Sequence, residues 1–199
     1  MQNTIKAPVR IDAADPQQFA DCRRKMNFTI RTATKADCKD IWRLIRSLAL
    51  HVNMLDHMKL THEDLERDGF SQNPWFECLV AEVPEKNKSK DGFRTVGIAN
   101  YCYKYNTWRG RSVFLEDFYV MPEFRGFGIG NTLLSTLAKE ARQKQCVHLD
   151  LMVTGQNGRS RAFYAAKGAQ DITVTDDWHV LRFDAQSLDK IVSGGPFAK

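Results

Sequence analysis

Three glycines alternate with other residues behind an arginine in the run Arg125-Gly126-Phe127-Gly128-Ile129-Gly130-Asn131. The residues before it, 113–120, are apolar and β-prone, and those after it, 132–141, have apolar side chains at three- and four-residue spacing. This order predicts a strand, a glycine-rich turn and an amphipathic helix. The N–H groups of such a turn lie at the positive end of a helix dipole, where they bind an anion such as phosphate. Glycine lets the anion approach the backbone closely.

The glycine spacing distinguishes among phosphate-binding loops. A P-loop has a lysine and a Ser/Thr after its last glycine, whereas Gly130 is followed by Asn131 and Thr132. A Rossmann fingerprint needs a third glycine one residue later, where Asn131 stands. The pattern Arg-x-x-Gly-x-Gly, from Arg125 to Gly130, is instead similar to the acetyl-CoA pyrophosphate loop of the GNAT superfamily of N-acetyltransferases.

Further segments narrow the resemblance. Residues 115–121, followed by the glycine run, resemble the spermidine/spermine (diamine) N-acetyltransferase family, including its thialysine acetyltransferase-like members. Collinear matches occur at Ala36–Cys38, Ile41–Ile45, Asp68–Phe70, Cys78–Pro84, Asn157 and Ser160–Tyr164, so that the similarity runs from about Phe28 to about Asp184. The resemblance implies an α+β GNAT fold, with a mixed, mostly antiparallel twisted sheet, a splayed central strand and flanking helices.

The resemblance also implies acetyl-CoA as cosubstrate and no metal. The family's cofactor positions fall on Phe118, Tyr119, Val120, Arg125, Gly126, Phe127, Gly128, Ile129, Gly130, Asn131, Asn157, Ser160 and Tyr164. The pantetheine arm is expected to pair with the splayed strand at 118–120. A backbone N–H of Tyr119 or Val120 would polarise the thioester carbonyl.

Acetyl transfer requires a neutral amine, yet a primary amine with a pKa near ~10.4 arrives protonated. Glu116 is the candidate base, directly or through water, because its strand position points it toward the reaction cleft. Asp117 would point to the opposite face of the sheet unless a bulge re-aims it. Tyr164 stands where the family has its general acid.

The sequence departs from the family pattern where the amine binds. The substrate-binding candidates are His51, Val52, Trp108, Glu116, Asp117 and Asp150. Val52 and Asn106 replace acidic residues, and Asp150 replaces a histidine. Fewer carboxylates weaken selection for a long polycation, so that a polyamine (spermidine, spermine), a shorter diamine such as putrescine and a lysine-like amine such as thialysine all remain open.

Two other functions are alternatives to a small-molecule acetyltransferase. A protein lysine or N-terminal acetyltransferase would favour an open groove rather than a small-amine site. A non-catalytic CoA-binding module would have lost Glu116 or Tyr164, and both are present.

Composition is that of one soluble domain. The 199 residues, 43% hydrophobic and 27% charged, suffice for a single core. No apolar run reaches the ~18–20 residues of a membrane span. The net charge of +5 suits a phosphate-rich ligand, and without a basic stripe interleaved with aromatics we expect no nucleic-acid partner. Residues 1–25 are interpreted as a flexible extension, 26–192 as the acetyltransferase domain and 193–199 as a flexible tail.

Cysteine and histidine usage favours a cytoplasmic protein without a metal site. The five cysteines form no Cys-x-x-Cys pair, and the five histidines show no His-Glu-x-x-His pattern. The resemblance further implies a homodimer, with strands after Gly168 completing the partner's site or interface.

The elements that must position these residues follow from periodicity and turn signals. We expect strands over 28–31, 76–83, 96–105, 113–120 and 148–153, with one or two more within 172–183. Helices are expected from Thr34 to Ala49, from Thr61 to about Asp68, and over 132–141, 160–167 and 185–191. A polar loop is expected over 84–92.

Overall fold

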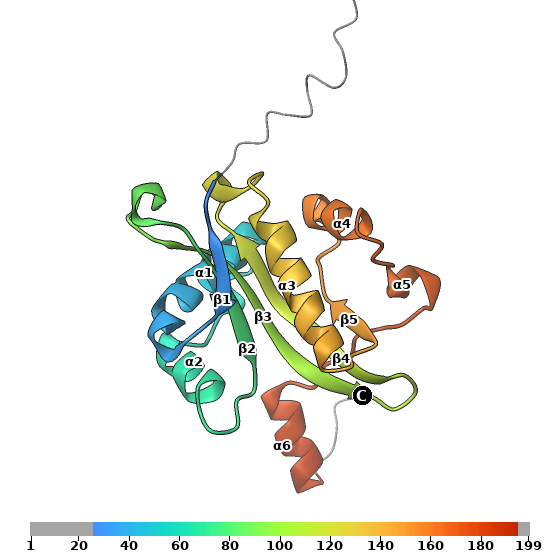
Figure 1. Cartoon of the computed structure of the whole chain (residues 1–199). Coiled ribbons are helices and arrows are strands. Elements are labelled where there is room, and N and C mark those ends of the chain that lie inside the picture. Colours follow the sequence, from blue (N-terminus) through green and yellow to red (C-terminus); the bar gives the residue numbers. More distant parts are fainter. Residues whose placement is uncertain (1–25, 195–199) are drawn as a thin grey trace, which may run out of the picture. The chain divides into compact units, whose positions relative to one another are not determined.

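The computed structural model describes residues 26–194 (Figure 1). The expected N-terminal extension, most of the expected C-terminal tail and Cys22 lie outside the described residues. The described chain divides into two compact units, residues 26–152 and 153–194. Each is described by itself.

The first unit contains a five-stranded sheet, as the family resemblance implies. Its strands are β1 (Thr29–Thr32), β2 (Glu77–Glu82), β3 (Thr95–Asn106), β4 (Gly110–Val120) and β5 (His148–Leu151), and they lie side by side in chain order. The pairings from β1 to β4 are antiparallel, whereas β5 runs parallel to β4. The expectation of a mixed, mostly antiparallel sheet is confirmed.

Three α-helices belong to this unit: α1 (Cys38–His51), α2 (His62–Gly69) and α3 (Ile129–Gln143). Short 3-10 helices are η1 (Lys35–Asp37), η2 (Leu55–His57), η3 (Glu85–Asn87) and η4 (Pro122–Phe124). The start signals predicted at Thr34 and Thr61 are confirmed, since each forms a capping box with an aspartate three residues later.

The helices cover opposite faces of the sheet (Figure 1). On one face α3 buries Leu133 and Leu137 among apolar residues of the strands, including Leu79, Ala99, Tyr101, Val113 and Leu115. On the other face α1 and α2 bury Ile41, Leu44 and Leu65 against Val80, Ile98 and Tyr119. Each such side chain contributes about 1.5–3 kcal/mol through removal from water, which fixes the sheet between the two helical layers.

The second unit contains α4 (Gly158–Ala165), α5 (Ile172–Thr175) and α6 (Ala185–Ser193). The helices predicted over 160–167 and 185–191 are confirmed with small shifts. The prediction of one or two strands within 172–183 is wrong, because 172–175 is helical and 176–183 is irregular. A strand needs a partner for its hydrogen bonds, and the sheet in the described part of the chain consists of β1 to β5, without a strand from 172–183.

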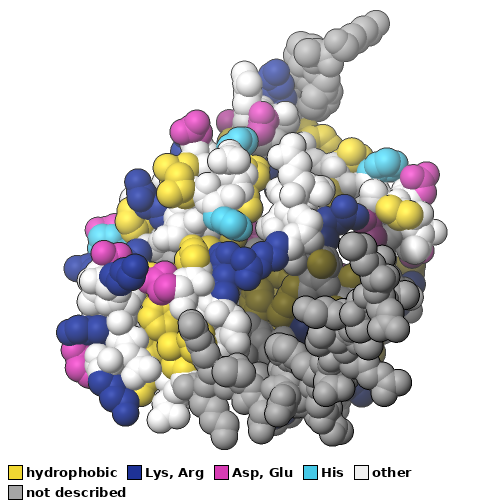
Figure 2. Space-filling view, turned by 90° about the horizontal axis from the view of Figure 1, so that it is seen from above, with side chains coloured by type: hydrophobic (Ala, Val, Ile, Leu, Met, Phe, Trp, Pro, Cys, Tyr) yellow, Lys and Arg dark blue, Asp and Glu magenta, His cyan; other side chains and the backbone are white. Residues whose placement is uncertain are grey.

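Figure 2 shows Lys and Arg side chains lying among Asp and Glu side chains on the face viewed, so no purely basic surface appears there. Across the described residues, every helix is too short or too polar to cross a bilayer.

Candidate active site

Strand β4 is splayed away from β5 along half of its length. The parallel pairing begins at Ser112 beside His148 and ends at Leu115 beside Leu151, whereas β4 continues to Val120. Residues 117–120 have their strand partners on β3, on the other side of β4. The ladder between β4 and β5 therefore ends five residues before β4 itself ends. The splayed central strand implied by the resemblance is present.

A β-bulge lies where the splay begins. Asn100 is opposite Asp117, but the next residue, Tyr101, is opposite Leu115, so that Glu116 is the extra residue on β4. Leu115 and Tyr101 pack in the α3-side core. The alternation before the bulge places Glu116 on the other face, and the bulge returns Asp117 to that same face. The two acids therefore share one face of the sheet.

The environments of these two acids differ. Glu116 is exposed, whereas Asp117 is partly buried and accepts a hydrogen bond from Asn100 Nδ2 at 3.2 Å. Burial raises the pKa of Asp117, the Asn100 hydrogen bond opposes that rise, and the charge of Glu116 adds to it. Adjacent carboxylates in unequal environments are a common arrangement for binding and moving a proton.

The glycine loop has the conformation that an anion site requires. Gly126 and Gly128 have φ angles of +86° and +88°, and Gly128 is the N-cap of α3. A Cβ on either glycine would point into open space rather than against protein. Among the described residues, the N–H groups of 126–131 have no hydrogen-bond acceptor, because the first helical bond is donated by Thr132 N to Gly128 O at 3.0 Å. The loop fits the diphosphate of a CoA ligand.

Arg125 braces the loop against β4. Its Nε donates to the carbonyl oxygen of Val120 at 2.8 Å, and its guanidinium carbon lies 5.4 Å from the ring centroid of Tyr119. One edge of the guanidinium thus ties the loop to the end of the strand, while its charge remains beside the amides of residues 126–131.

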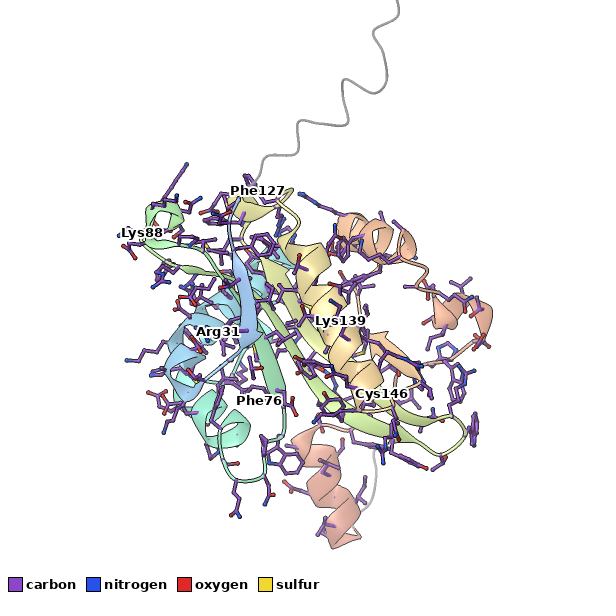
Figure 3. All side chains as sticks on the ribbon, viewed as in Figure 1. Arg31, Phe76, Lys88, Phe127, Lys139 and Cys146 are labelled. Carbon is purple, nitrogen blue, oxygen red and sulfur yellow. The ribbon has the colours of Figure 1, made fainter. Side chains whose placement is uncertain are left out.

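Helix α3 is anchored at its far end by a buried tyrosine. The hydroxyl of Tyr101 lies 2.6 Å from Glu140 Oε2 and 3.1 Å from Glu77 Oε2, joining α3, β3 and β2. Figure 3 shows Phe127 at the N-terminal end of α3 and Cys146 near the opposite end. The anchoring of α3 holds its N-terminus, and hence the loop, at a fixed place on the sheet.

Helix α4 carries the three remaining cofactor candidates. Asn157 caps the helix, because its Oδ1 accepts from Ser160 N at 3.2 Å. The ring of Tyr164 makes an edge contact with Phe163, with centroids 5.3 Å apart. Burial raises the pKa of Tyr164 to about 12, so its phenol keeps its proton at neutral pH, as a general acid must.

The predicted amine-binding residues are distributed over several elements. His51 ends α1, and Val52 caps that helix through its N–H to Leu48 O at 3.0 Å. Trp108 lies in the β3–β4 turn, about 20 Å from Glu116 along the strand. The first unit therefore brings together Glu116 and Asp117 but not Trp108.

Two substitutions relative to the family pattern have local roles. Asn106 Oδ1 accepts from the N–H groups of Trp108 at 2.9 Å and Arg109 at 3.0 Å, so it stabilises the turn. Asp150 Oδ2 lies 3.3 Å from His148 Nε2, on the face of β5 opposite to Leu149 and Leu151.

Asn100 and His148 were not predicted from the sequence, and each has a buried side-chain atom, Oδ1 and Nδ1 respectively, without a hydrogen-bond partner among the described residues. Asn100 is 6% exposed, and its Oδ1 has no hydrogen-bond partner. Such an acceptor costs about 1–3 kcal/mol when buried. A lone amide within the apolar run 96–102 was a signal that would have identified it.

Comparison with known proteins agrees with this geometry. A model described as Acetyltransferase (GNAT) family matches residues 45–169. The thialysine N-epsilon-acetyltransferase of Bos taurus is 41% identical over 162 residues, covering 81% of this chain and 95% of that protein. The spermidine/spermine N(1)-acetyltransferase-like protein 1 of Homo sapiens is 44% identical over 161 residues, covering 81% of this chain and 23% of that protein.

Solved structures share the fold at lower identity. An integron cassette protein from V. cholerae superposes with a TM-score of 0.65 at 23% identity, covering 84% of this chain and 98% of that one. A ribosomal-protein-alanine N-acetyltransferase from Brucella melitensis biovar Abortus 2308 gives a TM-score of 0.57 at 22% identity, covering 79% and 100%. From the family match and the identity to full-length relatives, the chain belongs to the acetyltransferase (GNAT) family.

Proposed function

We propose that the protein acetylates a primary amine of a small molecule, using acetyl-CoA in a ternary complex. The observation that carries this proposal is the organisation of β4. On this strand the pairing with β5 ends at Leu115, two carboxylates lie on one face, and the chain leads through η4 into the open amides of 126–131.

The chain's own residues divide the binding of acetyl-CoA between two features. The amides of 126–131 and the charge of Arg125 hold the diphosphate. The backbone of Phe118, Tyr119 and Val120 pairs with the pantetheine amides, and Asn157, Ser160 and Tyr164 on α4 complete the set. When bound, the cosubstrate supplies an acetyl thioester.

Two side chains move protons in the proposed reaction. Glu116 takes a proton from the substrate ammonium, directly or through water, and leaves a neutral amine. The amine nitrogen forms a bond to the acetyl carbon as the bond from that carbon to sulfur breaks. A backbone N–H of Tyr119 or Val120 stabilises the negative charge on the carbonyl oxygen. Tyr164 donates its phenolic proton to the departing thiolate, and the further proton that the acetylated nitrogen loses returns to the Tyr164 phenolate through water.

The names of the relatives support a small amine as substrate, with a thialysine-like amino acid and a polyamine as the two leading classes. Asp117, with Glu116, attracts the ammonium. His51, Val52, Trp108 and Asp150 are the other candidates for substrate contact.

We further propose a cytoplasmic homodimer. Cytoplasmic location is supported by the free thiols of Cys38, Cys78, Cys102 and Cys146. Dimerisation is supported by the second unit, in which every described residue is at least partly exposed and Val174, Val180, Leu181 and Phe183 are exposed. Sedimentation at micromolar concentration should give twice the chain mass; a monomer mass would contradict the dimer.

The activity is tested by a turnover screen with acetyl-CoA. The amines are thialysine, lysine, spermidine, spermine, putrescine, diaminopropane and simple monoamines, and the readout is free CoA together with the mass of the acetylated amine. We expect turnover of at least one amine. The relative turnover rates of the amines then rank the substrate classes. Tight binding of acetyl-CoA without turnover of any amine would contradict the proposal and favour a non-catalytic module.

A further inference from the structure

Two polar side chains, Asn100 and Asp117, lie beside the buried thiol of Cys78 on the α1 face of the sheet. Cys78 on β2 is opposite Asn100 on β3, and Asn100 is opposite Asp117 on β4. The next residues along this face are apolar, with Val80, Ile98 and Tyr119 in the α1-side core. A polar row beside an apolar core is costly unless its members serve one another or a ligand.

The orientation of the Asn100 amide is set by Asp117. Asn100 is almost fully buried, its Nδ2 donates to Asp117 Oδ2 at 3.2 Å, and its Oδ1 has no partner. Only the amino group of the amide can donate, so this orientation suits a charged carboxylate. Asn100 thus donates a hydrogen bond to Asp117 while its own Oδ1 remains without a hydrogen bond.

Asp117 forms no ion pair within residues 26–194. Among the described residues, no Lys, Arg or His nitrogen lies within 4.0 Å of either Asp117 or Glu116. The other oxygen of Asp117, Oδ1, has no hydrogen-bond partner in the described part of the chain. A partly buried carboxylate with one oxygen tethered and the other free is ready to receive an N–H donor.

The titratable groups around Asp117 do not help to keep it charged. Glu116, next to it on β4, raises its pKa. The thiols of Cys78 on β2 and Cys38 on α1 also have raised pKa values, that of Cys38 at about 11, with burial as the main cause. These thiols remain neutral at physiological pH, so the Asn100 hydrogen bond is the interaction that favours the carboxylate.

We infer that Asn100 is a positioning residue for amine recognition, which holds Asp117 as a carboxylate with its free oxygen available to the substrate ammonium. The inference rests on the proposed function, since it names the residue through which one carboxylate of that site acts. Asn100 does not touch the substrate. Its effect is to extend amine binding to lower pH than a carboxylate in this environment would otherwise allow.

The test measures amine affinity against pH. Thialysine and spermidine are titrated calorimetrically into the full chain saturated with CoA, between pH 5 and pH 8. The primary amines stay mostly cationic over this range, with pKa values near ~10.4, so a change in affinity reports on the protein. In Asn100→Leu we expect the midpoint of the affinity-versus-pH curve to rise by about one pH unit. At pH values below both midpoints the variant should then bind the amine about tenfold more weakly than the wild type. Affinity near pH 8 should approach that of the wild type.

The matched control is Asn100→Leu in an Asp117→Asn background. If Asn100 acts through Asp117, the added substitution should leave the pH dependence of the background unchanged. Asn100→Met provides a second apolar variant, and thermal unfolding shows whether each variant folds. Equal weakening at every pH, or an unchanged midpoint, would overturn the inference, because a packing defect alone would give the first result.

A second measurement separates this inference from the proposed function. The carboxyl carbon of Asp117 is titrated by NMR in the wild type and in Asn100→Leu, without any amine. A rise in the pKa of Asp117 in the variant supports the role of Asn100 even if neither amine binds, and absence of that rise refutes it. Failure of the wild type to acetylate any amine in the turnover screen would instead refute the proposed function.

Discussion

Arg31 and Asp37 form a two-pronged ion pair, with Nη1 donating to Oδ2 at 2.7 Å and Nη2 to Oδ1 at 2.8 Å. Asp37 also accepts from the backbone N–H and hydroxyl of Thr34, at 2.7 and 2.9 Å. Arg31 reaches Glu82 through Nε at 3.1 Å. The pair therefore connects β1 and the start of α1 to β2, on the face of the sheet opposite to α3.

This pair predicts acid sensitivity of folding. The Arg31 hydrogen bond is the main cause that lowers the pKa of Asp37 from 3.8 to about 2. A lowered native pKa stabilises the fold above the unfolded-state pKa, and this stability is lost as pH falls from about 4 through about 2. The contribution is about 2 kcal/mol. In Asp37→Asn, the free energy of unfolding at pH 7 should fall by at least that amount, with a shallower dependence on pH below 4.

The control is Glu85→Gln, which removes the exposed pair with Lys88. Exposed pairs contribute little, so urea unfolding of this variant should match the wild type. Equal urea midpoints for Asp37→Asn and the wild type at pH 7 would contradict the prediction.

Substitution of a glycine in the loop 126–130 should weaken acetyl-CoA binding, and a matched glycine variant elsewhere separates this effect from that of backbone strain. In Gly128→Val the side chain would project into the open space where the diphosphate binds, and the φ of +88° would be strained. The dissociation constant for acetyl-CoA, measured by calorimetry, should rise at least tenfold.

Gly110→Val is the matched variant, because Gly110 has a φ of +103° and likewise faces open space, but lies in the β3–β4 turn. It should lose a similar amount of stability and keep its affinity for acetyl-CoA. Normal affinity in Gly128→Val would show that the loop is not the anion site.

Tyr164→Phe removes one hydroxyl and keeps the ring that contacts Phe163. If Tyr164 protonates the thiolate, kcat should fall ~10²–10⁴-fold while acetyl-CoA affinity changes little. Because the pKa of the phenol is raised to about 12, wild-type kcat should show no loss of this acid up to about pH 10. Wild-type kcat in the variant, on its best amine, would refute the assignment.

Glu116→Gln keeps the size of the side chain at the bulge and removes its charge. If Glu116 assists deprotonation, the rate should fall most at low pH, where the free amine is scarcest. Glu123→Gln is a suitable control, since Glu123 is an exposed acid in η4. If Glu116→Gln had the wild-type rate at every pH, deprotonation would be assigned to solvent, and Glu116 would serve only to attract the ammonium.

The features that depend on local rules could be predicted from the amino-acid sequence. The alternation over 113–120, the glycines at 126, 128 and 130, and the helical spacing over 132–141 predicted β4, the loop and α3, because strand, turn and helix preferences act over a few residues. The capping boxes at Thr34 and Thr61 were likewise readable. The prediction of strands within 172–183 was wrong because a strand forms only beside another strand, and that pairing is not a local property of the sequence.

Contacts between side chains that are distant in the sequence depend on the packing of the whole fold. Asn100 and Asp117 are 17 residues apart in the chain and touch only because the β3–β4 hairpin has one particular register. The bulge at Glu116 determines the face on which Asp117 lies, and a shift of one residue would have sent it to the α3 side. From sequence periodicity alone, the face on which Asp117 lies could be stated only on the condition that a bulge was present. Register is fixed by the packing of both sheet faces at once, and no local pattern contains that information.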